Sequence, residues 1–147
     1  MILGTMSDGV KTISPTGSYE IDVPDAVQQD YDERVVSLWI EGDDTLLQLS
    51  SFRRTSAGPL PARARLSARL AKEGLHNVAI REEQLVDCGD SASASGTDKE
   101  GTHWIYTYAV WPDLTLLATA SHPKRLPDEG SWAMRALHTL RRPNANG

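Results

Sequence analysis

The feature that most constrains this fold is a pair of apolar segments joined by a two-residue turn. Residues 102–111 and 114–121 are rich in aromatic, β-branched and small apolar residues, and Pro112-Asp113 between them has turn chemistry. The pattern predicts an antiparallel hairpin in which Trp111 lies opposite Leu114, with side chains alternating between two faces. The apolar face, suited to a core, carries Ile105, Ala109, Trp111, Leu114, Leu116, Ala118 and Ala120.

The opposite face of this hairpin carries Trp104, Tyr106 and Tyr108, here called the aromatic stripe, among hydroxyl side chains. Aromatic rings beside hydrogen-bonding groups resemble the composition of a recognition surface. These three residues are therefore the candidate binding residues. The alternative is that a helix covers this face too and makes a three-layer structure. A shift of the pairing by one residue would also mix the two faces.

The rest of the chain predicts further hairpins and two amphipathic helices. One helix begins near Pro61 and ends before Gly74, and residues 24–33 and 89–101 are expected to be turns or loops. The expected strands cover residues 18–23, 34–41, 46–52, 77–88, 102–111 and 114–121, and the expected helices cover 61–73 and 128–141. The predicted fold is α+β: an antiparallel sheet of five to seven strands with the two helices packed on it as an α/β/α sandwich.

A chain of 147 residues is long enough for one domain with its own core. We expect residues 1–17 to be a flexible leader, 18–142 the domain and 143–147 a flexible tail. The net charge of −5 gives no reason to expect nucleic acid as a partner, and no apolar stretch is long enough for membrane insertion. Cys88 is the single cysteine, which fits a reducing compartment and predicts a cytoplasmic protein.

The order of these elements resembles the PsbP-like superfamily, which includes the bacterial DcrB-like domains. The resemblance is carried by Tyr19-Glu-Ile-Asp-Val-Pro24 as a first strand closed by proline, the helix at 61–73, the hairpin at 102–121 and the final Leu137-His-Thr-Leu-Arg141. Asp25 follows the proline where DcrB-like domains often have a tryptophan shortly after it, and no family binding residue matches a position here. The resemblance implies a non-catalytic binding or adaptor module. Some DcrB-like proteins are effector chaperones in type VI secretion, so a secretion-associated role is the most concrete one implied.

No catalytic or metal-binding motif is present in the sequence. The four histidines, at positions 76, 103, 122 and 138, show no metal-ligand spacing. His103 and His122 bracket the open end of the hairpin, but a metal site there needs a third ligand such as Asp98 or Glu100. Cys88 lies among acidic residues, which disfavour a reactive thiolate. We therefore expect no cofactor, no metal and no enzymatic activity, with a small enzyme using His103 and His122 as the alternative.

Charge is segregated along the chain. Residues 1–52 contain ten acidic residues against Lys11 and Arg34, whereas residues 53–72 contain six basic residues and no acidic one. Such blocks can steer a partner, although a solvated helix face whose arginines pair with nearby acids is the simpler interpretation. The leading hypothesis is a protein-binding or adaptor module that uses the aromatic stripe. The remaining alternative is a structural homodimer formed through the same stripe.

Overall fold

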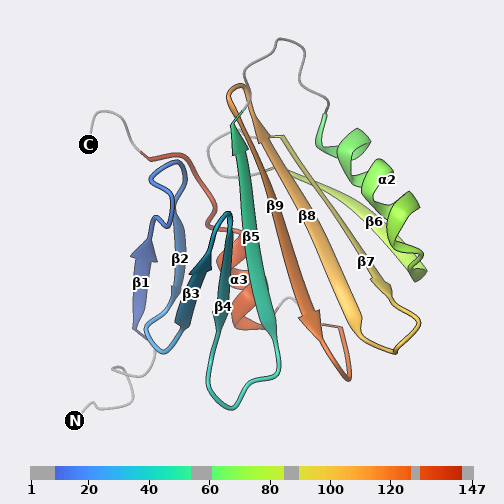
Figure 1. Ribbon diagram of the computed structural model, residues 1–147, viewed down its shortest axis with the longest axis horizontal. Coiled ribbons are helices and arrows are strands. Elements are labelled where there is room, and N and C mark those ends of the chain that lie inside the picture. The colour runs from blue at the N-terminus through green and yellow to red at the C-terminus, as the bar shows by residue number, and fades with distance from the viewer. Residues whose placement is uncertain (1–8, 54–60, 85–89, 127–129, 144–147) are drawn as a thin grey trace.

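The computed structural model describes residues 9–53, 61–84, 90–126 and 130–143, and it is dominated by antiparallel sheet (Figure 1). A seven-stranded sheet and a two-stranded sheet are accompanied by two short helices. The elements are β1 (Val10–Ile13), β2 (Ile21–Pro24), β3 (Gln28–Asp32), β4 (Val35–Trp39), β5 (Leu46–Arg53), α2 (Ala62–Glu73), β6 (His76–Gln84), β7 (Asp90–Thr97), β8 (His103–Trp111), β9 (Leu114–His122) and α3 (Trp132–Leu137). None of the helices in these ranges is long and apolar enough to cross a membrane.

The strand order of the large sheet is β3-β4-β5-β9-β8-β7-β6, and every pair in it is antiparallel. Strands that follow each other in the sequence pair as hairpins, except at the centre. There β5 pairs with β9, so that Arg53 lies opposite Leu114. This one pairing joins the two halves of the sheet.

The hairpin of β8 and β9 has the predicted register. Trp111 lies opposite Leu114, and Tyr106 lies opposite Thr119. The division of the hairpin into an apolar face and an aromatic face is therefore confirmed. The two faces of β8 belong to two separate cores.

The main core lies on the apolar face of the sheet, beneath α3 and the β1–β2 hairpin. α3 contacts both β2 and β9, and it lies behind the sheet in Figure 1. Ser131 caps α3, because its hydroxyl accepts a hydrogen bond from the backbone N–H of Met134 at 3.2 Å. α3 ends at Leu137 and is thus shorter than the helix expected over 128–141. The fully buried side chains of this core include Tyr19, Ile21, Leu38, Leu47, Leu49, Leu114, Leu116 and Leu140.

The second core lies on the opposite face, where α2 packs on β7 and β8. Its buried members are Ala62, Leu66, Ala92, Ala94, Tyr106 and Val110. α2 agrees with the predicted helix and ends at Gly74, which adopts the left-handed conformation with φ 63°. Pro61 offers no side-chain cap, and the carboxylate of Asp90 accepts a hydrogen bond from the Ala62 N–H at 2.8 Å instead. Strand β7 therefore fixes the start of α2.

The expectation of a loop over residues 89–101 is wrong for most of that segment, because Asp90–Thr97 form β7. The side chains of Ser91, Ser93 and Ser95 lie on one face of β7. Ala92, Ala94 and Gly96 lie on the other face, which is the face toward α2. A Cβ atom on Gly96 would lie 2.8 Å from the Leu75 Cβ, so the close approach of this segment requires small residues. Its serine and alanine residues alternate between the two faces, as expected for a strand. Alanine and glycine are too small, however, to give the contrast in hydrophobicity by which a strand is recognised in a sequence.

Two further segments differ from the sequence prediction. Val10–Ile13, placed in the expected leader, pair with β2 as β1 and are part of the fold. Gln28–Asp32, expected to be a turn, form the edge strand β3. β1 has no fully buried side chain and β3 is polar and exposed throughout, so pairing with β2 or β4 defines them rather than burial of their own side chains. Residues 1–8 and 144–147 of the expected leader and tail lie outside the described residues.

Candidate functional site

α2 covers only part of its face of the sheet. It contacts β7 and β8, and no described helix lies over β4 and β5 on the same side (Figure 1). We call this uncovered area the open face. Strand pairing assigns to it Val35, Ser37, Trp39, Leu46, Gln48, Ser50, Phe52 and Thr119, each of which is half-buried or exposed. The open face therefore combines two large aromatic rings with hydroxyl and amide groups.

The aromatic stripe lies at the border between α2 and the open face. Tyr106 is packed under α2 and is only 5% exposed, whereas Trp104 and Tyr108 are half-buried. The rings of Trp104 and Tyr106 meet edge to face, with centroids 5.7 Å apart and an angle of 60° between the planes. The stripe is thus partly core and partly surface, and a helix covers its middle member.

A cavity of about 280 Å³, here called the border pocket, lies beside the stripe. It brings together residues of α2, of β5 and β9, and of the turn between β7 and β8. The lining residues are Gln48, Arg69, Glu73, Leu75, Asp98, Trp104, Tyr106 and Thr119. Two of the three predicted binding residues therefore line a single pocket, together with three charged side chains that the sequence did not associate with them.

Asp98 holds the Trp104 ring in place. Its carboxylate accepts a hydrogen bond from the indole Nε1 at 2.9 Å, and it also accepts the backbone N–H groups of Glu100 and Thr102 at 2.9 and 3.0 Å. The hydrogen bond from Trp104, followed by those from the backbone, lowers the pKa of Asp98 below its ordinary value. Asp98 is accordingly an ionised acceptor that orients an aromatic ring.

Glu73 is engaged in a similar way on the opposite wall of the pocket. Arg69 Nε lies 3.3 Å from Glu73 Oε2, and Glu73 lies close enough to the Tyr106 phenol to influence its pKa. Burial, reinforced by the negative charge of Glu73, raises the pKa of Tyr106 to about 12. The phenol therefore stays protonated at neutral pH. Both carboxylates of the pocket position aromatic side chains, and the pocket presents hydrogen-bonding groups at an aromatic wall.

His103 and His122 are register partners at the open end of the hairpin, as the sequence suggested. Each has a separate local role. His103 Nδ1 lies 3.2 Å from Thr97 Oγ1, and His122 Nδ1 accepts the backbone N–H groups of Lys124 and Arg125 at 3.0 and 3.2 Å. Across the described ranges, no three histidine, cysteine, aspartate or glutamate side chains are grouped as a metal site. Cys88 falls outside those ranges.

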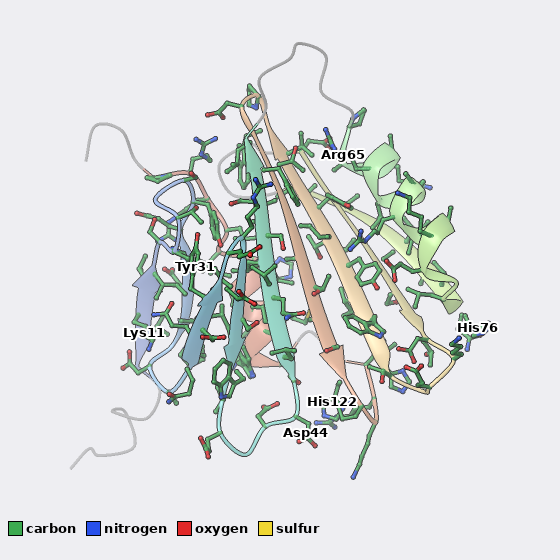
Figure 2. The ribbon with its side chains drawn as sticks, in the orientation of Figure 1. Lys11, Tyr31, Asp44, Arg65, His76 and His122 are labelled. Carbon is green, nitrogen blue, oxygen red and sulfur yellow. The ribbon has the colours of Figure 1, made fainter. Side chains whose placement is uncertain are left out.

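The open face has margins of opposite charge. Asp30 and Asp32, on β3, share the side of the sheet that carries α2, and both are exposed. At the other margin, Arg65 on α2 has a buried Nε atom without a hydrogen-bond partner. Figure 2 shows Arg65 and the β3 residue Tyr31 on opposite sides of β5. Any molecule lying across the open face would meet negative charge on one side and positive charge on the other.

Sequence reasoning missed most of this surface. Arg69 and Glu73 are four residues apart in a predicted helix, so their pairing could have been found from spacing alone. Gln48 and Thr119 lie opposite each other only because β5 pairs with β9. No local pattern in the sequence predicts the pairing of β5 with β9. This pairing completes the border pocket, because it brings Gln48 and Thr119 together.

Comparison with known proteins identifies the fold alone. No protein-family model and no curated protein matches the sequence. Among solved structures, a protein of Bacteroides thetaiotaomicron VPI-5482 is similar, with a TM-score of 0.64 and 16% sequence identity. The match covers 95% of this chain and 50% of that protein, so this chain spans about half the length of its structural neighbour.

Proposed function

We propose that this chain is a non-catalytic binding module that holds a polypeptide partner on the open face. The observation that carries the proposal is the exposure of aromatic side chains there: Phe52 is 44% exposed, and Trp39 is half-buried among hydroxyl and amide groups. Aromatic residues in such surroundings are enriched at protein interfaces and at their energetic hot spots. The accessible edges of Trp104 and Tyr108 extend this surface toward α2.

In this proposal the border pocket accepts one side chain of the partner. A cavity of about 280 Å³ suits a side chain better than a whole ligand, since small-molecule pockets are roughly 300–1,000 Å³. Gln48 and Thr119 offer donors and acceptors, and Trp104 offers an aromatic wall. The pocket would fix the register of the partner along the open face.

The resemblance to the PsbP-like superfamily supports an adaptor role. That family combines an antiparallel sheet with helices, and here α2 and α3 contact opposite faces of the sheet, which favours the α/β/α description. A secretion-associated chaperone of bacterial type, in the cytoplasm, is the specific form of this proposal. Its location rests on the single cysteine.

A second copy of the chain is the second candidate partner, and the charge of the margins favours it. A twofold arrangement of two open faces would bring the Asp30 and Asp32 margin of one copy onto the Arg65 margin of the other. None of these three residues forms an ion pair within the described residues, so all are available for such contacts. The function would then be that of a structural homodimer.

Site-specific photo-crosslinking tests the proposal. A photoreactive phenylalanine analogue is placed at Phe52 in the full chain, and the same analogue at Val78 is the control. Val78 lies on β6, an edge strand far from β4 and β5, and is 41% exposed, so the two positions are matched in exposure but only Phe52 lies on the open face. In the native cell, we expect a protein adduct at position 52 and none at position 78, and a Phe52→Ser variant should bind the purified partner at least tenfold more weakly.

The mass of the adduct decides between the candidates. An adduct with twice the mass of the chain, together with a dimer by light scattering, identifies a second copy; a heterologous adduct identifies an adaptor. Equal labelling at both positions, or unchanged affinity of Phe52→Ser, would contradict the proposal. A small enzyme that uses His103 and His122 would instead predict that His103→Gln abolishes a measurable turnover while leaving the adduct unchanged.

A further inference from the structure

A second cavity lies on the other side of the molecule, between the β1–β2 hairpin and α3. Its volume is about 490 Å³, and we call it the hairpin pocket. The lining residues are Gly9, Val10, Asp22, Val23, Pro24, Trp132, Arg135, Ala136 and Thr139. This volume is within the range of small-molecule sites, roughly 300–1,000 Å³. The pocket shares no residue with the open face or the border pocket.

The walls of the hairpin pocket are mostly apolar. Val23 and Ala136 are buried members of the main core, and Pro24 closes β2 beside them. Val10 is 63% exposed, the most exposed of the large apolar side chains in the described chain. An apolar ligand lying against Val10 and Pro24 would remove this surface from water, which is favourable in proportion to the area buried.

One polar group of the pocket is unsatisfied. Trp132 is only 5% exposed, and its indole Nε1 is buried without a hydrogen-bond partner. Buried donors are nearly always paired, and leaving one unpaired costs about 1–3 kcal/mol. A small movement of the Trp132 ring toward the cavity would bring this nitrogen to a ligand, and a hydrogen-bond acceptor that met it there would recover this cost on binding.

The charges around the pocket favour a negatively charged acceptor. Arg135 is exposed at the pocket and contributes a guanidinium group, one nitrogen of which hydrogen-bonds to the Gly130 carbonyl. Asp22 is the one acidic lining residue, and Arg141 Nη2 lies 3.0 Å from its carboxylate. This hydrogen bond lowers the pKa of Asp22, so the ion pair is formed at neutral pH and its charges offset each other. Among the lining residues, Arg135 is then the one charged side chain whose charge no ion pair offsets within the described part of the chain.

We propose that the hairpin pocket binds a small amphiphilic carboxylate. Its apolar chain or ring would lie against Val10, Val23 and Pro24. Its carboxylate would accept hydrogen bonds from the Trp132 indole and from Arg135. The inference is independent of the proposed partner on the open face, because the two surfaces use different elements on opposite sides of the sheet.

Nuclear magnetic resonance of the indole N–H groups tests this directly. The chain has four tryptophans, at positions 39, 104, 111 and 132, and thus four indole resonances. The indole resonance that is missing from the spectrum of Trp132→Phe is that of Trp132. Octanoate is titrated into the nitrogen-15-labelled full chain as the probe, with octylamine and 1-octanol as chain-length-matched controls. We expect octanoate to move the Trp132 indole proton downfield to a plateau, leaving the other three resonances in place.

Arg135→Gln should weaken octanoate binding about tenfold, because a charged hydrogen bond becomes a neutral one. Lys72→Gln, which removes an exposed cation from α2, should leave it unchanged. The proposal is overturned if the Trp132 resonance stays fixed, if all four resonances move together, or if octylamine or 1-octanol shifts it as strongly at equal concentration. Folding of Arg135→Gln is checked by its unchanged thermal midpoint, as expected for an exposed side chain.

Discussion

Tyr106 belongs to two features at once, since its ring packs under α2 in the second core and its phenol lines the border pocket. Trp104 and Tyr108 point in the same direction from β8 but lie outside the centre of the helix contact. A single strand thus supplies one residue that stabilises the fold and two that reach the surface.

Alanine variants of the stripe should separate these roles. Tyr106→Ala should lower the free energy of unfolding by roughly 3–5 kcal/mol, as expected for removal of a large buried aromatic side chain. Tyr108→Ala and Trp104→Ala should each cost less, because both rings remain in partial contact with water. Urea unfolding followed by circular dichroism measures all three. Equal, large losses would assign the whole stripe to the core and remove it from the binding surface.

The ionisation of Tyr106 is a second test at the same residue. The difference between the ultraviolet titrations of wild type and Tyr106→Phe should show a phenolate appearing with a midpoint near pH 12. This pKa is raised above the unfolded value of about 10. The part of the folding stability that is linked to the raised pKa is therefore fully present below pH 10 and is lost as the pH rises toward 12. A midpoint near 10 would show that the phenol is neither buried nor held beside Glu73.

At the scale of elements, the contact between α2 and β7 depends on the absence of side-chain volume. Ala92, Ala94 and Gly96 form the surface of β7 that faces the helix and the segment after it. Asp90, at the start of the same strand, caps the helix. The strand with the least apolar bulk in the sheet is therefore the one that positions α2.

Gly96→Ala should be destabilising by about 1–3 kcal/mol, because the new methyl group would lie 2.8 Å from the Leu75 Cβ and 3.1 Å from the His76 carbonyl oxygen. Ser95→Ala is the matched control, since it changes the neighbouring residue on the opposite face of the same strand. Thermal unfolding of the two variants provides the comparison. A stability of Gly96→Ala equal to that of the control would mean that the segment after α2, at Leu75 and His76, does not approach β7 as closely as described.

The elements that could be predicted are those whose signal is local. The β8–β9 hairpin alternates bulky residues around a two-residue turn, and α2 has a proline at its start and a glycine at its end, so both were found from the sequence. Strand β7 was missed because alanine, serine and glycine give no hydrophobic contrast. Strand β3 was missed because its five residues are all exposed, and only its pairing with β4 makes it a strand.

The candidate site was predicted only in part for a related reason. Trp104, Tyr106 and Tyr108 are adjacent on one strand, so their common direction follows from strand geometry. Gln48 and Glu73 reach the same pocket from β5 and α2. Their placement depends on the pairing between distant segments and on where α2 packs. Neither can be predicted from a local sequence pattern.

At the scale of the whole molecule, Arg141 connects the two ends of the described chain. Its backbone pairs with Glu20 through two hydrogen bonds, and its guanidinium contacts Glu20 Oε1 at 3.2 Å and Asp22 Oδ1 at 3.0 Å. The β1–β2 hairpin has no strand pairing with the large sheet in the described chain, so it is held by the burial of Ile21 and Val23 in the main core, by packing against α3 and by this contact.

Arg141→Gln should lower the free energy of unfolding by about 1 kcal/mol, since its ion pairs are about 30% exposed and partly screened by solvent. The more informative effect should be local. Amide hydrogen exchange should become faster in β1 and β2 while β8 and β9 keep their protection. Arg135→Gln, a neighbouring exposed arginine without these partners, is the control. Uniformly faster exchange across the sheet would contradict a local role for Arg141.

The position of β9 between β5 and β8 has a consequence for how the chain folds as it is made. Within the large sheet, strands β3, β4 and β5 are synthesised first and β6, β7 and β8 follow, but the two groups join only through β9, the last strand of this sheet to be made. Until then β5 is an unpaired edge, and apolar residues such as Leu47 and Leu49 have no complete core to enter. Long-range pairing of this kind slows folding. The nascent chain therefore keeps this unpaired edge until β9 has been synthesised, and it then acquires a continuous sheet in one late step.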